Sequence, residues 1–362
     1  CHHWEYSLMK AIRQLKKDSP LVVEDVPDPT LKDSDVLVSI EAAGVLSYHE
    51  DVLSGKLGYA LPPLPFTPGN DGVGIIEEVG STILHVSVGD RVAIDPRIFA
   101  SENVTEPEGM LLALTGLTPE ASRIQQIWRD GTWAEKVAVP SDNVTKLPEI
   151  EGMNGVGLSR VYKFAVCYGG LSRGHLVGGE TVVVLGATGN FGSPAVPLAI
   201  AMGASRVVAL GRNESVLASL SQISPRVIPV KLSGDPHADA LAIRQVVPGG
   251  VDFGLDLIGQ ANDSSGIQAV IGGLRRGGRV VIQGSMDVPL ELPYGSVMAR
   301  DISIIGAFMY PRDTFRKLSA LVECGALDLD CVEVEAYALD DVQAAMRRAN
   351  EVRGLGHIVL TP

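Results

Sequence analysis

Three glycines, Gly186, Gly189 and Gly192, have the spacing of a loop that binds phosphate groups. An apolar, β-branched run at 181–185 precedes them, and a helix-like apolar segment and a second strand ending at Leu210 follow. In this order Gly186 permits a tight turn, Gly189 lets the backbone approach a pyrophosphate at the helix N-terminus, and Gly192 lets the helix pack on the sheet. The pattern predicts a dinucleotide site, the alternative being a glycine-rich turn of another α/β domain. The residues between the glycines are further candidates for cofactor contacts: Thr188, Asn190 and Phe191.

The end of the second strand, about twenty residues further on, predicts which dinucleotide binds. An acidic residue there would hydrogen-bond the ribose 2′-hydroxyl of NAD. This chain has Gly211, followed by Arg212 and Asn213. A guanidinium without a nearby carboxylate favours a 2′-phosphate, so the sequence predicts NADP(H). The alternative is that Arg212 is a solvated surface cation and that Glu214 contacts the ribose.

The elements that must position these residues fall into two groups. Before about Pro148, short β-rich runs separated by Gly, Pro and Asp predict a β-barrel-like domain. From about Glu180, apolar strands alternate with helical patterns, which predicts a doubly wound parallel sheet and hence an α/β fold. Pro197 falls in the helix after the glycines, where we expect a kink or bulge. Strands are expected at 181–185, 206–210, 226–230, 251–257, 279–282, 302–305 and 356–360, and helices at 313–323 and 339–350.

Composition narrows the class of protein. The 362 residues suggest about two domains at ~150 residues each. A net charge of -13 argues against nucleic acid or an anionic membrane as partner. The uncharged stretch at 181–205 is broken by Gly and Pro, so we expect no membrane span. The four cysteines show no close pairing, which predicts a cytoplasmic protein. Residues 1–8 are interpreted as a remnant of expression, with Met9 as the natural start.

Several short segments carry a family resemblance: AAGV at 42–45, PGNDGVG at 68–74, VG at 79–80, VGDRV at 88–92, GTWAE at 131–135 and the glycine turn at 186–192. With them the chain resembles the medium-chain dehydrogenase/reductase superfamily over nearly its whole length. The resemblance implies a GroES-like catalytic domain at 9–158 and 306–362. It implies a Rossmann cofactor-binding domain at 159–305.

The chain departs from zinc-dependent members of that superfamily at their metal ligands. The ligand Cys is replaced by Leu46 and the ligand His by Asn70. Cys167 resembles the third ligand, but one thiolate cannot hold a catalytic zinc, so it is interpreted as a small buried hydrophobe. The lobe at 95–130, which holds a structural zinc in relatives, contains no cysteine. We therefore expect a zinc-independent enzyme with no metal site.

The same resemblance suggests what replaces the metal. The relay Ser/Thr position of zinc-containing relatives is occupied by Tyr48. A phenol can hydrogen-bond a developing alkoxide and then donate its proton. His49 and Asp51 are candidates for relaying protons to solvent, and Asn70 for a neutral donor. The alternatives are that Tyr48 is an amphipathic wall and that His49 satisfies a buried backbone group.

Four further cofactor contacts are implied by the resemblance and by position at strand ends. They are Ile258, Gly284, Phe308 and His357. His357 stands where relatives place a basic pyrophosphate contact, the alternative being a surface histidine of the final strand.

Taken together, the sequence predicts a zinc-independent, NADP(H)-dependent alcohol dehydrogenase or carbonyl reductase acting on a small aldehyde or ketone, as a homodimer. The rival enzyme class is a quinone or enone reductase, in which the hydride goes to a β-carbon. The non-catalytic alternative is an NADPH-binding sensor or structural protein.

Overall fold

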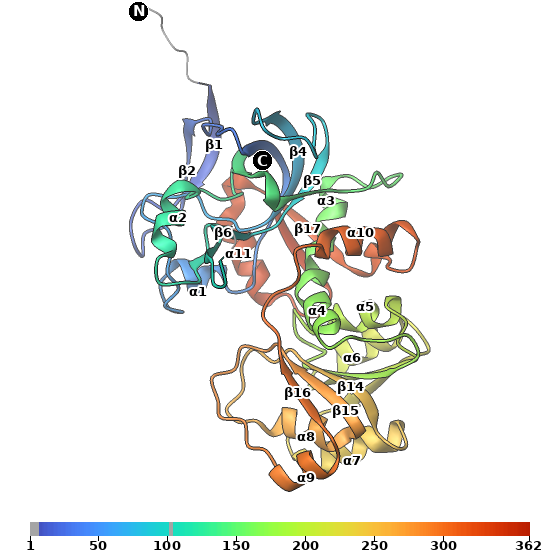
Figure 1. The fold of residues 1–362 in the computed structure, drawn as a ribbon. Helices are drawn as coiled ribbons and strands as arrows, with labels where there is room; N and C mark the ends of the chain where they lie inside the picture. Colours follow the sequence, from blue (N-terminus) through green and yellow to red (C-terminus); the bar gives the residue numbers. More distant parts are fainter. Residues whose placement is uncertain (1–6, 101–103) are drawn as a thin grey trace, which may run out of the picture. The chain divides into compact units, whose positions relative to one another are not determined.

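The computed structural model describes residues 7–100 and 104–362. The chain divides into two compact units (Figure 1). The barrel unit comprises Cys1–Tyr162, Glu333–Val352 and His357–Pro362, and the Rossmann unit comprises Lys163–Val332 and Arg353–Gly356. The domain limits implied by the family resemblance, 9–158 with 306–362 and 159–305, stay a prediction.

The barrel unit is built mainly from antiparallel strands. A seven-stranded sheet has the order β10-β5-β4-β3-β18-β17, with β9 also paired to β3, and β1-β2 and β6-β7-β8 form two smaller sheets. Its strands are β1 (Leu8–Arg13), β2 (Val22–Pro27), β3 (Asp35–Gly44), β4 (Gly72–Val79), β5 (Arg91–Ile94), β6 (Arg97–Ala100), β7 (Glu108–Leu111), β8 (Thr115–Gly116), β9 (Lys136–Pro140), β10 (Val144–Lys146), β17 (Glu333–Ala338) and β18 (Gly356–Thr361). Its helices are α1 (His49–Leu53), α2 (Ala121–Ile127), α3 (Gly155–Leu158) and α11 (Val342–Glu351), with single 3₁₀ turns at Ser141–Asn143, Ser159–Val161 and Leu339–Asp341.

Strand β3 organises the barrel unit and leads into the candidate catalytic segment. Most of its ten residues are buried, and it pairs antiparallel with β4, β9 and β18. Most residues of the strand are apolar, as burial of both faces requires, and its polar residues are Asp35, Ser39 and Glu41. Phe66 and Trp133, both fully buried, pack in the same core. Gly44 at the end of β3 therefore has a fixed position from which the chain enters α1.

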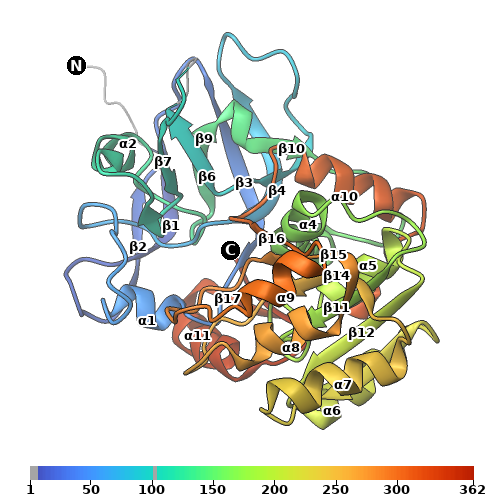
Figure 2. The ribbon, with the colours of Figure 1, turned by 60° about the horizontal axis from the view of Figure 1, so that its bottom comes forward.

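The Rossmann unit is built around a six-stranded sheet in the order β13-β12-β11-β14-β15-β16. All neighbouring strands are parallel, and the order is that of the dinucleotide-binding fold, so the predicted fold class is confirmed. Figure 2 shows α8 lying along strands β11, β14 and β15. The elements are α4 (Tyr162–Arg173), β11 (Thr181–Leu185), α5 (Ala195–Ala201), β12 (Arg206–Gly211), α6 (Glu214–Ser221), β13 (Val227–Lys231), α7 (Pro236–Val246), β14 (Val251–Asp256), α8 (Ser265–Gly273), β15 (Leu274–Ile282), α9 (Tyr294–Ala299), β16 (Ser303–Gly306), α10 (Thr314–Glu323) and a 3₁₀ turn at Leu329–Cys331.

Helix α5 explains how Pro197 is accommodated. The helix has seven residues and begins at Ala195, so Pro197 is its third residue. The amides of a first turn have no intrahelical acceptor, and a proline there removes no hydrogen bond of the helix. The kink or bulge expected from the sequence is therefore not required.

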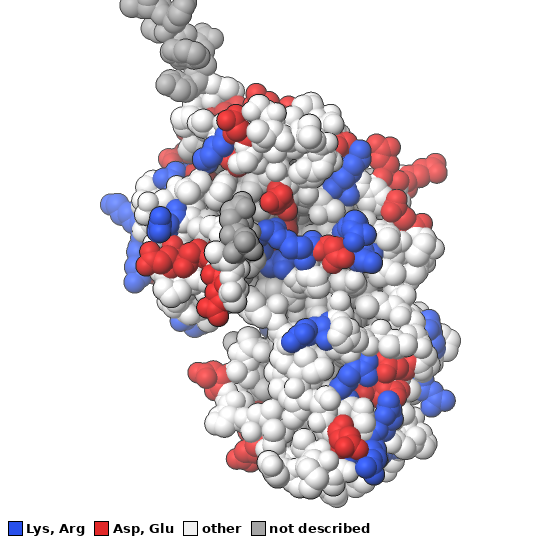
Figure 3. Space-filling model, viewed as in Figure 1, with Lys and Arg blue, Asp and Glu red and all other residues white. Residues whose placement is uncertain are grey.

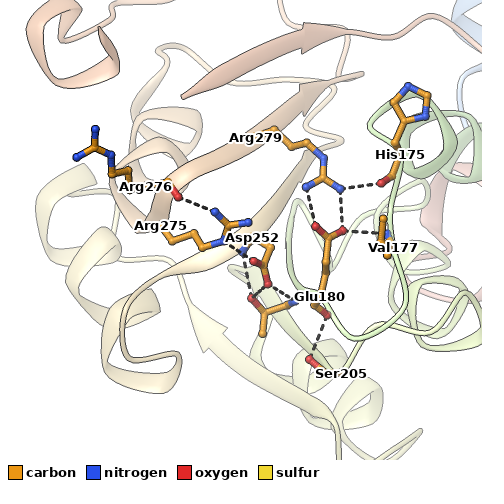
Figure 4. Close-up of polar contacts among 9 residues, drawn as sticks. His175, Val177, Glu180, Ser205, Asp252, Arg275, Arg276 and Arg279 are labelled. Carbon is orange, nitrogen blue, oxygen red and sulfur yellow. Dashed lines mark hydrogen bonds and ion pairs between the residues drawn. The ribbon is translucent and has the colours of Figure 1, made fainter. Parts of the chain in front are cut away.

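Two ion pairs fix the amino ends of the parallel strands (Figure 4). Both terminal nitrogens of Arg279 in β15 bind the carboxylate of Glu180, at 2.9 and 2.7 Å, just before β11. Asp252 in β14 accepts bonds of 2.7 and 2.9 Å from the amide and hydroxyl of Thr181 and also pairs with Arg275. These contacts hold the end of the sheet opposite the glycine turn. They leave the carboxyl ends of the strands, where parallel sheets of this kind bind their ligands, without these ion pairs.

Surface charge is dispersed on the side shown in Figure 3, where positive and negative groups lie interspersed among uncharged residues. Among the described residues, no helix combines the length and apolar character that crossing a membrane requires.

Candidate functional site

Tyr48 immediately precedes α1 in the barrel unit, four residues after the end of β3. Its ring meets Tyr59 edge to face, with the ring centroids 6.3 Å apart. Burial raises the pKa of the phenol above its ordinary value, and negative charge on Tyr59 or Asp71 would raise it further. The phenol is therefore held protonated at neutral pH, in the form that donates a hydrogen bond.

His49 is the first residue of α1 and is fully buried. Its Nδ1 accepts a 2.8 Å hydrogen bond from the amide of Leu46, and the ring packs edge-on against Trp133, 4.7 Å between centroids. Burial lowers its pKa to about 3, so the ring is neutral and carries its hydrogen on Nε2. The structure thus places His49 in the backbone-satisfying role that the sequence left open beside proton transfer.

Asp51 lies in α1, two residues after His49, and has a different partner. Its Oδ1 accepts a 3.0 Å bond from Nζ of Lys56, whose side chain is exposed, while that of Asp51 is about one third exposed. This ion pair at the surface is not a contact with Tyr48 or His49, so the structure does not bring Asp51 together with the other candidates.

Asn70 and Asp71 form the buried polar centre of this region. Oδ1 of Asn70 is buried and has no hydrogen-bond partner among the described residues. Oδ1 of Asp71 accepts a 3.1 Å bond from the amide of Gly44, and a Cβ at Gly44 would lie 2.4 Å from that oxygen. Burial raises the pKa of Asp71 to about 6, although the bond from Gly44 opposes the rise. Only glycine at position 44 allows this carboxyl so close to β3.

Asp71, which directly follows Asn70, was not among the candidate site residues of the sequence analysis. Its charge acts on the phenol of Tyr48, and its proton is exchanged close to neutral pH. A buried carboxyl with a perturbed pKa is a functional-site candidate. The available signal was the motif at 68–72, in which Asn70 and an acid stand between two glycines.

The glycine turn of the Rossmann unit has the shape that the sequence predicts. Gly186 adopts a φ of +81°, which favours glycine, and a Cβ on Gly192 would lie 1.9 Å from the carbonyl oxygen of Gly186. Around Gly189 there is space, because a Cβ there would find its nearest neighbour at 3.4 Å. Among the described residues, the amides at 188 and 190–192 donate to no backbone carbonyl. Free amides and an open approach at Gly189 fit a phosphate group.

The carboxyl ends of β11, β14 and β15 meet beside this turn. Strand residues Leu185 and Asp256 lie opposite each other in the parallel register. A Cβ on Gly186 would touch the side chain of Ile258 at 3.2 Å, and one on Gly284 would clash with its carbonyl oxygen at 2.2 Å. The structure therefore brings together the predicted cofactor residues Gly186, Ile258 and Gly284.

A second group of predicted cofactor residues meets at the end of β12. A Cβ on Gly211 would lie 2.6 Å from Cγ2 of Thr188. Arg212 is exposed and has no polar partner among the described residues. Asn213 caps α6, its Oδ1 accepting from the amides at 215 and 216, and Glu214 pairs with Lys231 at 3.2 Å. The acid that could have contacted a ribose is thus engaged elsewhere, while the guanidinium is available.

Comparisons with known proteins agree with this geometry. The family model of the alcohol dehydrogenase GroES-like domain matches residues 32–149, and that of zinc-binding dehydrogenases matches 191–323. Together the matches cover well over half of the chain and both units. The chain belongs to the medium-chain dehydrogenase/reductase superfamily. The members of this superfamily are oxidoreductases that use pyridine nucleotides, and the predicted family is confirmed at that level.

Individual relatives span the whole chain. An NAD-dependent alcohol dehydrogenase of Sulfurisphaera tokodaii is 26% identical over 366 residues, covering 98% of this chain and all of its own. A quinone oxidoreductase of Sus scrofa is 28% identical over 324 residues, covering 88% of this chain and 86% of its own. The crystal structure of AibC superposes with a TM-score of 0.81 at 22% identity, covering 100% of this chain and 99% of that one, a likeness of fold.

The metal-ligand positions of zinc-dependent superfamily members carry other side chains here. Leu46 is apolar, and Asn70 offers a neutral amide. Burial raises the pKa of the Cys167 thiol to about 12, and this thiol donates a 3.3 Å hydrogen bond to the main-chain oxygen of Phe164. Within 7–100 and 104–362, no three His, Cys, Asp or Glu side chains are grouped so that they could hold a metal ion.

The two remaining cofactor candidates lie in different units. Phe308 follows β16 in the Rossmann unit with 72% of its surface exposed. His357 is buried in β18 of the barrel unit. Their roles in cofactor binding stay predictions.

Lys163 in α4 is a residue that the sequence analysis missed. Its Nζ donates a 3.1 Å hydrogen bond to the main-chain oxygen of Asn190 in the glycine turn. The residue as a whole is partly exposed, but burial of its ammonium lowers the pKa to about 8. A lysine in a mostly apolar helix was the available signal, since such a position requires a polar partner.

Proposed function

We propose that this oxidoreductase is a zinc-independent, NADP(H)-dependent alcohol dehydrogenase or carbonyl reductase that acts on a small aldehyde or ketone. The observation that carries the proposal is the protonated phenol of the partly exposed Tyr48, whose pKa is raised by burial of the hydroxyl and further by Tyr59 and Asp71. It occupies the segment in which zinc-dependent relatives place their metal. A protonated donor in this segment supplies the electrophile that the missing metal would otherwise supply.

In the direction of reduction, a reduced nicotinamide held by the glycine turn would supply the hydride that the carbonyl carbon accepts. The carbonyl oxygen gains negative charge, and Tyr48 donates a hydrogen bond and then its proton to that oxygen. The products are the alcohol and a phenolate, which regains a proton from solvent. Negative charge on Asp71 disfavours the phenolate, so this charge opposes proton transfer from Tyr48, which is easier while Asp71 is protonated.

The choice of NADP(H) rests on the end of β12. Arg212 is exposed and free among the described residues, Gly211 lies against Thr188, and Glu214 is paired with Lys231. A free guanidinium can bind a 2′-phosphate in bidentate fashion, and no carboxylate at the strand end opposes it. The relative from Sulfurisphaera tokodaii is named NAD-dependent, so direct affinity measurements must test this choice.

Replacing Tyr48 with Phe tests the proposal, because it removes the hydroxyl and keeps the ring. If Tyr48 stabilises charge in the transition state, kcat and kcat/KM should fall together by about 10²- to 10³-fold, with NADPH affinity unchanged. Tyr59→Phe is the matched control, because it removes the hydroxyl of the adjacent ring. Near-parental turnover of Tyr48→Phe would show that the ring is only a wall of the site.

A quinone or enone reductase is the second candidate, favoured by the similarity to the Sus scrofa quinone oxidoreductase. Reduction with NADPH deuterated at the transferred position distinguishes the two. We expect the label on the carbinol carbon, whereas label only on a β-carbon would assign the enzyme to the second class. An NADPH-binding sensor would bind the nucleotide but oxidise it with no member of an aldehyde, ketone, enone and quinone panel.

A further inference from the structure

Lys163 brings a positive charge to the glycine turn that no acidic residue balances. Nζ donates to the main-chain oxygen of Asn190, and in the part of the chain that the structure describes no Asp or Glu forms an ion pair with it. A lysine ammonium has three donors, and this bond uses one of them. Two donors of a buried cation therefore remain available at the turn.

The turn itself has the complementary features. Among the described residues, the amides at 188 and 190–192 have no backbone acceptor, and the surroundings of Gly189 are open. A buried, unbalanced ammonium is unfavourable unless an anion joins it. Free amides and an ammonium with two unused donors at one turn suit the same ligand group, a doubly charged diphosphate.

We propose that Lys163 binds the pyrophosphate of the dinucleotide, with its ammonium fixed to the turn by the oxygen of Asn190. The inference rests on the proposed dinucleotide binding and adds a specific binding residue from a helix outside the glycine motif. Lys163 thereby supplies the charge of this contact, while Arg212 remains assigned to the 2′-phosphate at the other end of the turn.

The geometry has a consequence for pH. Burial lowers the pKa of Lys163 to about 8, and Cys167 in the same helix is the titratable group that acts on it. The pKa of Cys167 is raised to about 12, so Cys167 stays neutral in this range. A bound anion favours the ammonium, so binding takes up a proton above pH ~8, and affinity falls there by up to about tenfold per pH unit.

Calorimetric titration of the full-length protein with two ligands tests the proposal. NADPH contains the pyrophosphate, and adenosine 2′-monophosphate does not. At pH 7, Lys163→Met should weaken NADPH by about ten- to a hundredfold and leave adenosine 2′-monophosphate within about twofold. Lys163→Arg, which keeps the charge, should recover most of the NADPH affinity. Lys317→Met, at an exposed lysine of α10, is the control for loss of a positive charge.

Proton uptake gives a readout that does not depend on a stable Met variant. NADPH titrations at pH 8.5 in buffers of different ionisation enthalpy should show proton uptake by the parent and none by Lys163→Arg, because arginine stays charged. Absence of uptake by the parent, or an unchanged NADPH affinity of Lys163→Met, would overturn the inference. Equal weakening of both ligands would assign Lys163 to holding the shape of the turn. A parent that binds neither NADPH nor NADH would instead refute the proposed function.

Discussion

At the scale of single residues, burial decides which form of each acid and base this protein keeps. His49 stays neutral and Tyr48 stays protonated, while Asp71 changes charge near pH 6. All three belong to the barrel unit, and two of them have different backbone partners: the amide of Leu46 for His49, and that of Gly44 for Asp71. Burial therefore separates the pKa values of neighbouring groups, as acid-base catalysis at neutral pH requires.

Asp71 should make the protein less stable as pH rises. The pKa of its carboxyl is raised from 3.8 to about 6, so its stabilising effect is complete below about pH 4 and is lost as pH rises through 6. This rise is equivalent to on the order of 3 kcal/mol at most. Asp71→Asn keeps an oxygen acceptor for Gly44 and cannot ionise. Its gain in the free energy of unfolding over the parent should therefore be near zero at pH 3.5 and grow towards pH 7.5, as measured by urea denaturation. A constant difference would mean that Asp71 does not titrate in the fold.

Arg212 should decide the choice between the two nucleotides. If its guanidinium binds the 2′-phosphate, Arg212→Ala should weaken NADPH by roughly ten- to a hundredfold and leave NADH nearly unchanged. Fluorescence titration of both nucleotides measures the ratio directly. Arg276→Ala, at another exposed arginine of the Rossmann unit, is the control. Equal affinities of the parent for NADPH and NADH would refute the assignment.

At the scale of elements, the glycine turn joins two different requirements in one loop. Gly192 must lack a Cβ because the backbone of Gly186 lies against it. At Gly189 the protein itself would tolerate a Cβ, so the glycine matters because it lets a ligand approach the backbone closely. The two glycines therefore serve folding and binding respectively.

Two alanine substitutions separate these roles. Gly192→Ala forces a Cβ to within 1.9 Å of a carbonyl oxygen and should lower the free energy of unfolding by about 1–3 kcal/mol or more. Gly189→Ala should leave thermal stability nearly unchanged and weaken NADPH binding. Thermal melts and nucleotide titration of both variants make the comparison. The reverse pattern would show that Gly189 is the structural glycine.

At the scale of the whole molecule, the chain combines a superfamily fold with altered metal-ligand positions. Leu46 and Asn70 cannot replace a cysteine and a histidine as zinc ligands, and the lobe at 95–130 contains no cysteine. The homodimer and the cytoplasmic location stay predictions at this scale.

Removal of metal should leave this enzyme active. We expect activity after dialysis against EDTA to remain within about twofold of the starting value, because a catalytic zinc needs about three protein ligands. Elemental analysis of the purified protein should show far less than one zinc per chain. Stoichiometric zinc, together with lost activity after chelation, would contradict the proposed mechanism.

The sequence by itself determined the features that depend on local order along the chain. Alternating apolar strands and helical segments predicted the parallel sheet, and its first strand at 181–185 has the predicted limits. The glycine spacing predicted the turn, because Gly192 must lack a Cβ to pack against the backbone of Gly186, which lies within the same seven residues. The absence of a cysteine at 46 and a histidine at 70 was also visible in the sequence, because only certain residue types can bind a metal ion.

Only the tertiary structure decided which polar groups meet and which are buried. Asp71 reaches Gly44, and Lys163 reaches Asn190, across 27 residues of chain in each case. Asp51, adjacent to the candidate site in sequence, turns instead to Lys56 at the surface. The physical reason is that a pKa and a hydrogen bond depend on distance and desolvation in space, and residue spacing fixes these only within a single helix, strand or turn.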